Sequence, residues 1–127
     1  MARRILLADD ERLSRLGTQR VLERLGYDVV GVANGREAVE AEATGSFDAV
    51  IMDCQMPEMD GFKATVAIRR REAENGGDRT PIIGLSGRAM DGDREAALAK
   101  GMDGYLTKPF TVPELKTALE EWVGRHA

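Results

Sequence analysis

Five short apolar runs alternate with longer amphipathic segments along the chain. The runs cover residues 5–8, 27–32, 49–53, 82–86 and 105–107. Short apolar runs that are bounded by polar residues are typical of strands buried on both faces of a sheet. The strict alternation of strands with helices predicts right-handed crossovers and a parallel sheet with helices on both sides.

The segments between the runs carry helical signals. After the first run, apolar residues recur at the spacing of one helix face: Leu13, Leu16, Val21, Leu22 and Leu25. Gly26 is expected to end that helix. Asn34 followed by Glu37 matches a capping box, and Thr111 followed by Glu114 matches a second one. These signals predict helices after the first, second and fifth strands.

Two further helices are predicted in the middle of the chain. The dipeptide Asp60-Gly61 is expected to open the third helix. We interpret the basic run Arg69-Arg70-Arg71, near its end, as a solvated helix face. An alanine-rich stretch over about 91–100 predicts a fourth helix, which has high helix propensity but little apolar area to hold it against the sheet.

Length and composition restrict the class of protein. A chain of 127 residues suits a single domain over residues 1–127, whose core needs no disulfide or structural metal. The net charge of −4 and the pI near 5.1 argue against nucleic acid as a direct partner. Cys54 is the only cysteine, so the chain has no disulfide framework and a reducing compartment is expected. No apolar run is long enough to span a membrane, and the N-terminus lacks the apolar region of a signal peptide. We therefore expect a cytoplasmic domain without membrane contact.

Polar side chains stand where four of the apolar runs end. Asp9 and Asp10 follow the first run, Asp53 ends the third, Ser86 ends the fourth, and Lys108 follows the fifth. Ligands bind at the carboxyl ends of the strands in an open parallel α/β sheet. The pattern therefore predicts a phosphoryl-accepting site on a flavodoxin-like sheet.

The charges at this edge indicate a metal ion. Two carboxylates about 4 Å apart repel by roughly 4 kcal/mol at an effective dielectric constant near 20. Asp9, Asp10 and Asp53 together carry three negative charges, which a divalent cation and Lys108 would neutralise. Oxygen ligands with room for water suit Mg²⁺, and Mn²⁺ is the expected substitute. An aspartate forms an acyl phosphate when its donor is itself energy-rich, such as a phosphohistidine.

Four motifs together resemble a known family. They are Asp9-Asp10-Glu11, the stretch 52–61 around Asp53, Ser86, and Lys108-Pro109-Phe110. In order and spacing they are similar to those of response-regulator receiver domains over essentially the whole chain. The resemblance implies an α/β, flavodoxin-like (βα)5 fold, doubly wound around a five-stranded parallel sheet of order 2-1-3-4-5.

The resemblance also implies a role for each residue at the predicted metal site. Asp53 becomes the phosphoacceptor and a metal ligand. Asp10 becomes a direct Mg²⁺ ligand, whereas Asp9 binds the ion mainly through water. The backbone carbonyl of Gln55 completes the set of ligands.

Three further residues receive roles from the same resemblance. Ser86 and Tyr105 become a switch pair that alters the face formed by the fourth helix, the fifth strand and the fifth helix. Lys108 becomes the contact to the phosphoryl group. We expect its ammonium to lie at an exposed strand end, and we expect the Lys108–Pro109 peptide bond to be cis.

The resemblance implies partners rather than a separate substrate. A histidine kinase or a histidine phosphotransfer protein would supply the phosphoryl group, and phosphorylation is compatible with a homodimer. The domain would catalyse only its own phosphorylation and slow dephosphorylation. The stretch from Cys54 to Pro57, together with Gly101-Met102-Asp103 and Trp122, is more similar to receivers of hybrid sensor histidine kinases than to those of DNA-binding regulators.

Three other classes of protein compete with this interpretation. A phosphatase of the haloacid-dehalogenase type needs a second aspartate two residues after the first, where this chain has Gln55. A flavodoxin needs a phosphate loop rich in Ser, Thr and Gly, whereas Asp9-Asp10-Glu11 would repel phosphate. A receiver-like module used only for protein binding would not need the combination of carboxylates, Ser86 and Lys108.

Overall fold

Strands and helices alternate without exception in the computed structural model, which describes residues 3–56, 58–76, 79–87 and 93–123. In chain order the elements are β1 (Arg4–Ala8), α1 (Arg12–Arg24), β2 (Asp28–Val32), α2 (Gly35–Thr44), β3 (Ala49–Asp53), α3 (Gly61–Asn75), β4 (Ile82–Ser86), α4 (Asp93–Ala99), β5 (Gly104–Thr107) and α5 (Val112–Trp122). Each predicted strand and helix is present; of the predicted fourth helix, residues 91–92 lie outside the described residues. None of the described helices is long and apolar enough to cross a membrane.

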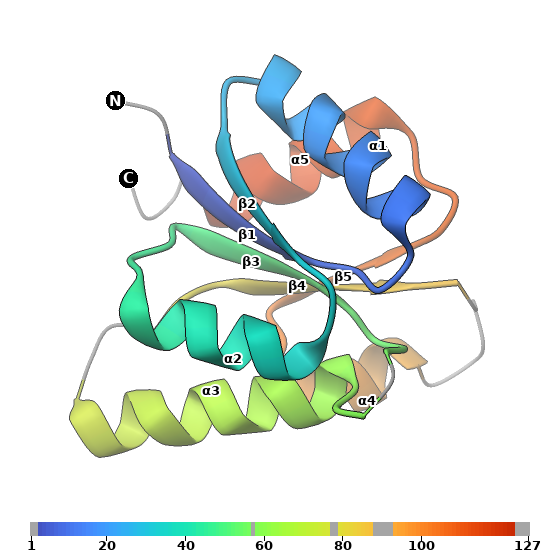
Figure 1. Cartoon of the computed structure of the whole chain (residues 1–127). Coiled ribbons are helices and arrows are strands. Elements are labelled where there is room, and N and C mark those ends of the chain that lie inside the picture. Colours follow the sequence, from blue (N-terminus) through green and yellow to red (C-terminus); the bar gives the residue numbers. More distant parts are fainter. Residues whose placement is uncertain (1–2, 57, 77–78, 88–92, 124–127) are drawn as a thin grey trace.

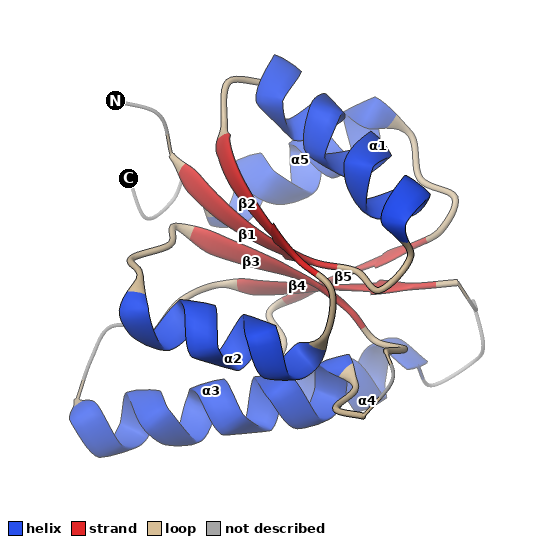
Figure 2. Cartoon of the chain, viewed as in Figure 1, coloured by secondary structure: helices blue, strands red, loops and turns tan. Residues whose placement is uncertain are grey.

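The strands form one parallel sheet in the order β2-β1-β3-β4-β5 (Figure 2). This order is the predicted 2-1-3-4-5 order, and the doubly wound α/β class is therefore confirmed. β1 and β3 lie next to each other in the centre, so that the chain reverses its direction of winding between them. The crevice at this reversal is where ligands bind in such sheets.

Two hydrophobic layers sandwich the sheet. α1 and α5 cover one face, and α2, α3 and α4 lie on the other (Figure 1). Side chains of one strand alternate between the layers, as strand geometry requires. In β1, for example, Ile5 and Leu7 pack with Leu22 of α1, whereas Leu6 and Ala8 pack with the opposite layer. Both faces of β1, β3 and β4 are buried, which explains their nearly continuous apolar runs.

The register of the strands brings their polar ends together. Ala8 pairs with Met52 and Asp53 pairs with Leu85, so Asp9, Asp53 and Ser86 are close to one level of the sheet. Ser86 in turn pairs with Thr107, which places Lys108 at the same edge. The parallel arrangement thus gathers side chains that are far apart in the sequence.

Side-chain caps fix the beginnings of two helices as predicted. The Thr111 hydroxyl accepts a hydrogen bond from the Glu114 N–H at 3.2 Å, and the Glu114 carboxylate accepts one from the Thr111 N–H at 2.8 Å. At α2 the Asn34 side chain accepts from the Glu37 N–H, but the Glu37 carboxylate reaches the N–H of Ala33 instead of Asn34. This second cap is therefore shifted by one residue from the predicted box.

The interpretation of the basic run as a solvated face is wrong for Arg69. Its side chain is only 13% exposed and donates at 2.6 Å to Asp103 and at 2.7 Å to Glu72. It also donates to the carbonyl groups of Thr80 and Gly101. Burial is tolerated because every charge is paired and hydrogen-bonded. The group ties the end of α3 to the segments that enter β4 and β5.

Candidate functional site

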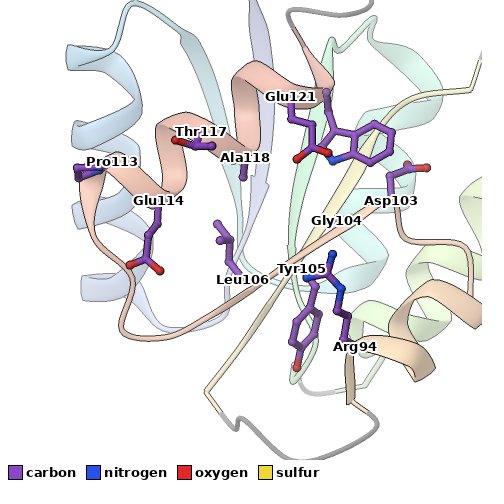
Figure 3. Close-up of a pocket in the computed structure, with 11 residues that line it drawn as sticks. Arg94, Asp103, Gly104, Tyr105, Leu106, Pro113, Glu114, Thr117, Ala118 and Glu121 are labelled. Atoms are coloured by element: carbon purple, nitrogen blue, oxygen red, sulfur yellow. The ribbon is translucent and has the colours of Figure 1, made fainter.

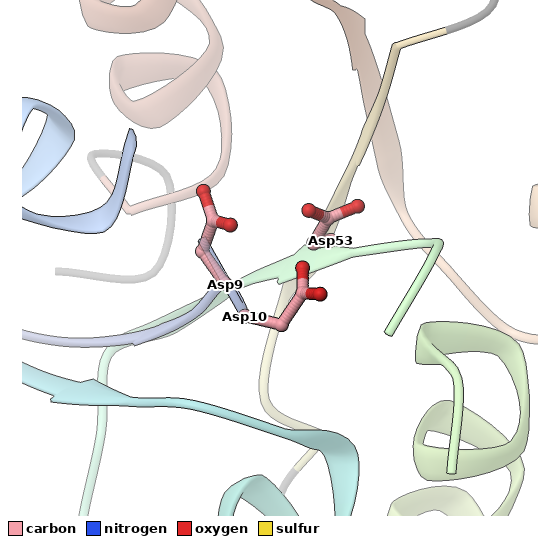
Figure 4. A group of neighbouring side chains, drawn as sticks. All are labelled: Asp9, Asp10 and Asp53. Atoms are coloured by element: carbon pink, nitrogen blue, oxygen red, sulfur yellow. The ribbon is translucent and has the colours of Figure 1, made fainter. Parts of the chain in front are cut away.

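Three carboxylates meet beside the central strands (Figure 4). One oxygen of each of Asp9, Asp10 and Asp53 lies within 4.8 Å of the others. Asp9 is fully buried and Asp53 is 6% exposed, whereas Asp10 is exposed. Such a group of like charges is unfavourable unless cations offset it.

Lys108 supplies one of these cations. Its ammonium nitrogen lies 3.2 Å from Asp9 Oδ2 and 3.2 Å from Asp53 Oδ2. The Lys108 side chain is 24% exposed, so the prediction of an exposed ammonium is wrong. The ammonium turns inward because both carboxylates lie beneath it. The Lys108–Pro109 peptide bond is cis, as expected.

For both Asp53 and Lys108, burial and the charge of the partner shift the pKa in opposite directions. Burial raises the pKa of the Asp53 carboxyl, and the hydrogen bond from the Gln55 N–H (3.0 Å) and the charge of Lys108 only partly offset the rise. Burial would lower the pKa of Lys108, but the charges of Asp53 and Asp9 outweigh it and raise that pKa. Lys108 is therefore held as a cation. The single ammonium does not fully offset the cost of burying the Asp53 carboxylate, and the pKa of Asp53 stays raised.

The donor set suits a hard divalent cation. All three carboxylates offer oxygen atoms, and Mg²⁺ is bound in proteins by one or two carboxylates together with several waters. Asp10, being exposed, leaves the open side that such waters require. The cluster fits a metal ion and remains a candidate for one.

Close packing fixes the backbone next to Asp53. A side-chain carbon at Gly61, the first residue of α3, would overlap the carbonyl group of Asp53. The Gly61 N–H donates to the carbonyl of Cys54 at 3.2 Å, while the Cys54 N–H donates to Leu85 of β4 at 2.8 Å. The acceptor strand therefore ends against α3 and β4, and only glycine permits this approach.

An open cleft of about 540 Å³ gives access to the cluster. It is lined by Asp10, Glu11, Asp53, Gln55, Met56, Gly87 and Lys108. Gln55 thus lies at the cleft, and Ser86 is buried immediately before Gly87 at the end of β4. The cleft is large enough for a small anionic group above Asp53.

Tyr105 lies on another surface, away from the carboxylates. Its half-buried ring packs against the core and lines a cavity of about 420 Å³ between α4, β5 and α5. Figure 3 shows Tyr105 beside Arg94 of α4, with Leu106 and Ala118 toward α5. Ser86, at the end of β4, and Tyr105, at this cavity, therefore lie on adjacent strands.

Two residues of α1 that hold Asp9 were not identified from the sequence. The Ser14 hydroxyl donates to Asp9 Oδ2 at 2.6 Å, and the Arg15 guanidinium donates to the Asp9 carbonyl at 2.8 Å. Both belong to the helix that follows Asp9, but no motif marks them. Leu13, predicted only as an apolar helix position, is 78% exposed beside them.

Comparison with known proteins agrees with this geometry. A family model described as the response regulator receiver domain matches residues 5–120. The sensor protein GacS of Pseudomonas syringae pv. syringae is 43% identical over 123 residues, which are 97% of this chain and 14% of that protein. The chain therefore spans only a small part of that relative.

Two solved structures extend the comparison. The receiver domain of a sensor histidine kinase from Pseudomonas aeruginosa, with a magnesium ion in its active site cleft, is 40% identical, with a TM-score of 0.88 over 98% of this chain and 99% of that one. The Saccharomyces cerevisiae receiver domain of Ssk1, bound to the histidine phosphotransfer protein Ypd1, is 26% identical, with a TM-score of 0.93 over 99% of this chain and 92% of that one. Receivers from a sensor kinase and from a phosphorelay thus share this fold.

Proposed function

The chain belongs to the response regulator receiver domain family, whose members accept phosphoryl groups in phosphorelays, and we propose that Asp53 is its acceptor. The observation that carries this assignment is the Lys108–Asp53 ion pair at the floor of an open cleft. Asp9 also contacts Lys108 but is fully buried, and Asp10 lies outside this ion pair. Asp53 alone combines access to the cleft with a facing ammonium.

The transfer is balanced without a further reactant. A carboxylate oxygen of Asp53 forms a bond to phosphorus while the bond from phosphorus to the donor imidazole nitrogen breaks, and the imidazole keeps the electron pair. Lys108 neutralises a phosphoryl oxygen, and the Ser86 hydroxyl donates a hydrogen bond to another. Water later cleaves the acyl phosphate and returns phosphate and the Asp53 carboxylate.

Asp10, Asp53 and the Gln55 carbonyl would hold Mg²⁺ directly, and Asp9 would hold it through water. When bound, the ion neutralises carboxylate charge and aligns the phosphoryl oxygens. Mn²⁺, which also prefers oxygen ligands, would substitute. The carboxylate cluster and the magnesium ion in the related sensor-kinase receiver support this part of the proposal.

The donor would be the phosphohistidine of a histidine kinase or a phosphotransfer protein. A groove of about 680 Å³ runs along α1 and shares Glu11, Gly87 and Lys108 with the acceptor cleft. The exposed side chain of Leu13 lies in this groove. A partner that covers this apolar surface would deliver its imidazole to Asp53. The complex of the related yeast receiver with a phosphotransfer protein supports this class of partner.

Phosphorylation would be transmitted through Ser86 and Tyr105 to the surface formed by α4, β5 and α5. Of the described α4 side chains only Ala97 is buried, and Leu98 is 43% exposed. At about 25 cal/mol per Å² of apolar area, so small a contact holds α4 weakly. Movement of α4 would change the Tyr105 cavity, where a second copy or another partner would bind.

The proposal also covers the extent of the domain, its lack of a separate substrate and its cellular compartment. Residues 1–127 form one receiver domain that turns over no separate substrate and contacts neither nucleic acid nor membrane. The net charge of −4 supports the exclusion of nucleic acid. The lone, buried Cys54 suits the reducing cytoplasm. Similarity to sensor kinases supports an origin in a hybrid kinase, of which a receiver would be a small part.

Intact-mass measurement tests the acceptor. With Mg²⁺ and either acetyl phosphate or a phosphohistidine donor, the protein should gain one phosphoryl group, which hydroxylamine should remove because it cleaves acyl phosphates. Asp53→Asn should gain none. Asp28→Asn, an exposed change on β2, serves as the matched control and should behave like the parent. An Asp53→Asn variant that acquires the adduct at the parent's rate would exclude Asp53.

A further inference from the structure

Every oxygen of the buried Asp9 carboxylate is engaged by the protein. Oδ1 accepts from the Glu11 N–H at 3.0 Å. Oδ2 accepts from the Ser14 hydroxyl at 2.6 Å and from the Lys108 ammonium at 3.2 Å. Ser14 and Lys108 therefore donate to the same oxygen atom, Ser14 as a neutral hydroxyl and Lys108 as a cation.

The Lys108 ammonium is in turn shared among three oxygens. Besides Asp9 and Asp53, it lies 3.4 Å from the Ser14 hydroxyl oxygen. An ammonium has three N–H donors, so these contacts use its whole capacity. Lys108 cannot contact a phosphoryl oxygen without giving up part of this arrangement.

We propose that Ser14 is a positioning residue that releases Lys108 from Asp9 for the incoming phosphoryl group. This inference rests on Asp53 being the acceptor. A buried carboxylate oxygen that is left without any donor is strongly destabilised. Because the Ser14 hydroxyl remains on Oδ2, that oxygen keeps a hydrogen bond when the ammonium moves. Without Ser14, Asp9 and the phosphoryl group would compete for one cation.

The position of Ser14 argues against a merely local role. A serine inside a helix commonly bonds a carbonyl one turn earlier or points to solvent. Ser14 lies in the first turn of α1 and instead bonds a carboxylate five residues back, outside the helix. It also lines the groove along α1, where a larger side chain has space.

A pair of isosteric variants isolates the hydroxyl. Ser14→Thr keeps the donor, whereas Ser14→Val has the same shape without it. With acetyl phosphate at saturating Mg²⁺, the rate of Asp53 phosphorylation should fall about tenfold in Ser14→Val, since a hydrogen bond to a charged group is lost. Ser14→Thr should stay near the parent rate. The Mg²⁺ concentration for half-maximal rate should change little in either, because among the described contacts Ser14 bonds Asp9, proposed to hold the ion only through water, and neither of the proposed direct carboxylate ligands, Asp10 and Asp53.

A double-mutant cycle decides whether Ser14 acts through Lys108. In the Lys108→Ala background, Thr and Val at position 14 should give equal rates. Equal rates of Ser14→Thr and Ser14→Val in the presence of Lys108 would overturn the inference. So would a tenfold difference that persists without Lys108, or a difference explained by the half-maximal Mg²⁺ concentration. Failure of the parent protein itself to be phosphorylated would instead refute the proposed function.

Discussion

The ammonium nitrogen of Lys108 lies 3.2 Å from Asp53 Oδ2, although 55 residues separate the two in the chain. The ion pair joins the end of β3 to the loop after β5 and bridges over β4, the strand between them. It places a positive charge beside the carboxylate that we propose as the acceptor. The ammonium that would neutralise an incoming phosphoryl oxygen therefore already lies next to Asp53 in the unphosphorylated protein.

Removal of the ammonium should destabilise the metal-free protein. Lys108→Ala leaves Asp9 and Asp53 facing each other, and we expect a loss of about 1–3 kcal/mol in the free energy of unfolding, because breaking a partly buried ion pair leaves charge uncompensated. Mg²⁺ should recover part of this loss, and phosphorylation should be slower. Thermal unfolding in EDTA and in Mg²⁺ measures the effect, with the exposed Lys116→Ala as control. An equal loss in EDTA and in Mg²⁺ would mean that the cation does not replace the ammonium.

Mg²⁺ should stabilise the folded protein by binding the carboxylate cluster. A ligand at 100 times its dissociation constant adds about 2.7 kcal/mol to stability. Millimolar Mg²⁺ should therefore raise the melting temperature, and Asp10→Ala should lose most of the increase. Glu23→Ala, which removes an exposed carboxylate from α1, should keep it. If the parent melts at the same temperature in EDTA and in Mg²⁺, the cluster is not a metal site.

Phosphorylation should alter the Tyr105 cavity as well as the cleft. Beryllofluoride, which stands in for the phosphoryl group, should shift backbone amide resonances across residues 86–110 in addition to those near Asp53. The effect is a population shift, which a bias of a few kcal/mol suffices to produce. Ser86→Ala should keep the shifts at the cleft and lose those at Tyr105. Shifts confined to the loops around Asp9, Asp53 and Lys108 in the parent would show that the bound group does not drive a switch.

Glu42 should make stability depend on pH. Burial against α3 raises the pKa of this α2 carboxyl, and the Thr80 hydroxyl at 3.3 Å only partly opposes it. A carboxyl with a raised folded-state pKa contributes stability below its unfolded pKa and loses it as the pH rises through the folded value. Glu42→Gln should therefore unfold at higher denaturant than the parent at pH 7, and the difference should vanish below about pH 4.3.

Glu40→Gln is the matched control for this prediction. Glu40 lies on the same helix, but its side chain is 66% exposed. Its removal should change stability little at any pH, since exposed ion pairs contribute about 0–1 kcal/mol. A Glu42→Gln variant that is less stable than the parent at pH 7 would show that the ion pair with Arg71 outweighs the cost of burial.

Sequence pattern alone predicted a parallel sheet with helices on both faces, because its signals are local or periodic, and the strand order came from the family resemblance. Apolar runs report strands with two buried faces, and the Thr111–Glu114 box is closed by residues three apart. Alternation of strands and helices then leaves few topologies. The strand-end positions of Asp9, Asp53 and Ser86 follow from the parallel sheet, whose strands end at one edge.

Only the tertiary structure decided which charged groups meet. The Lys108–Asp9 contact joins residues 99 apart, and Arg69 reaches Asp103 across 34 residues. Hydrophobic periodicity indicates which face of a helix or strand is buried. It does not indicate where the end of a long charged side chain lies, because that end binds an opposite charge that can be distant in the sequence. Lys108 and Arg69 were therefore expected in solvent and are folded inward. Ser14 went unnoticed for the same reason: its partner oxygen is supplied by a strand end that only the packing of α1 brings within 2.6 Å.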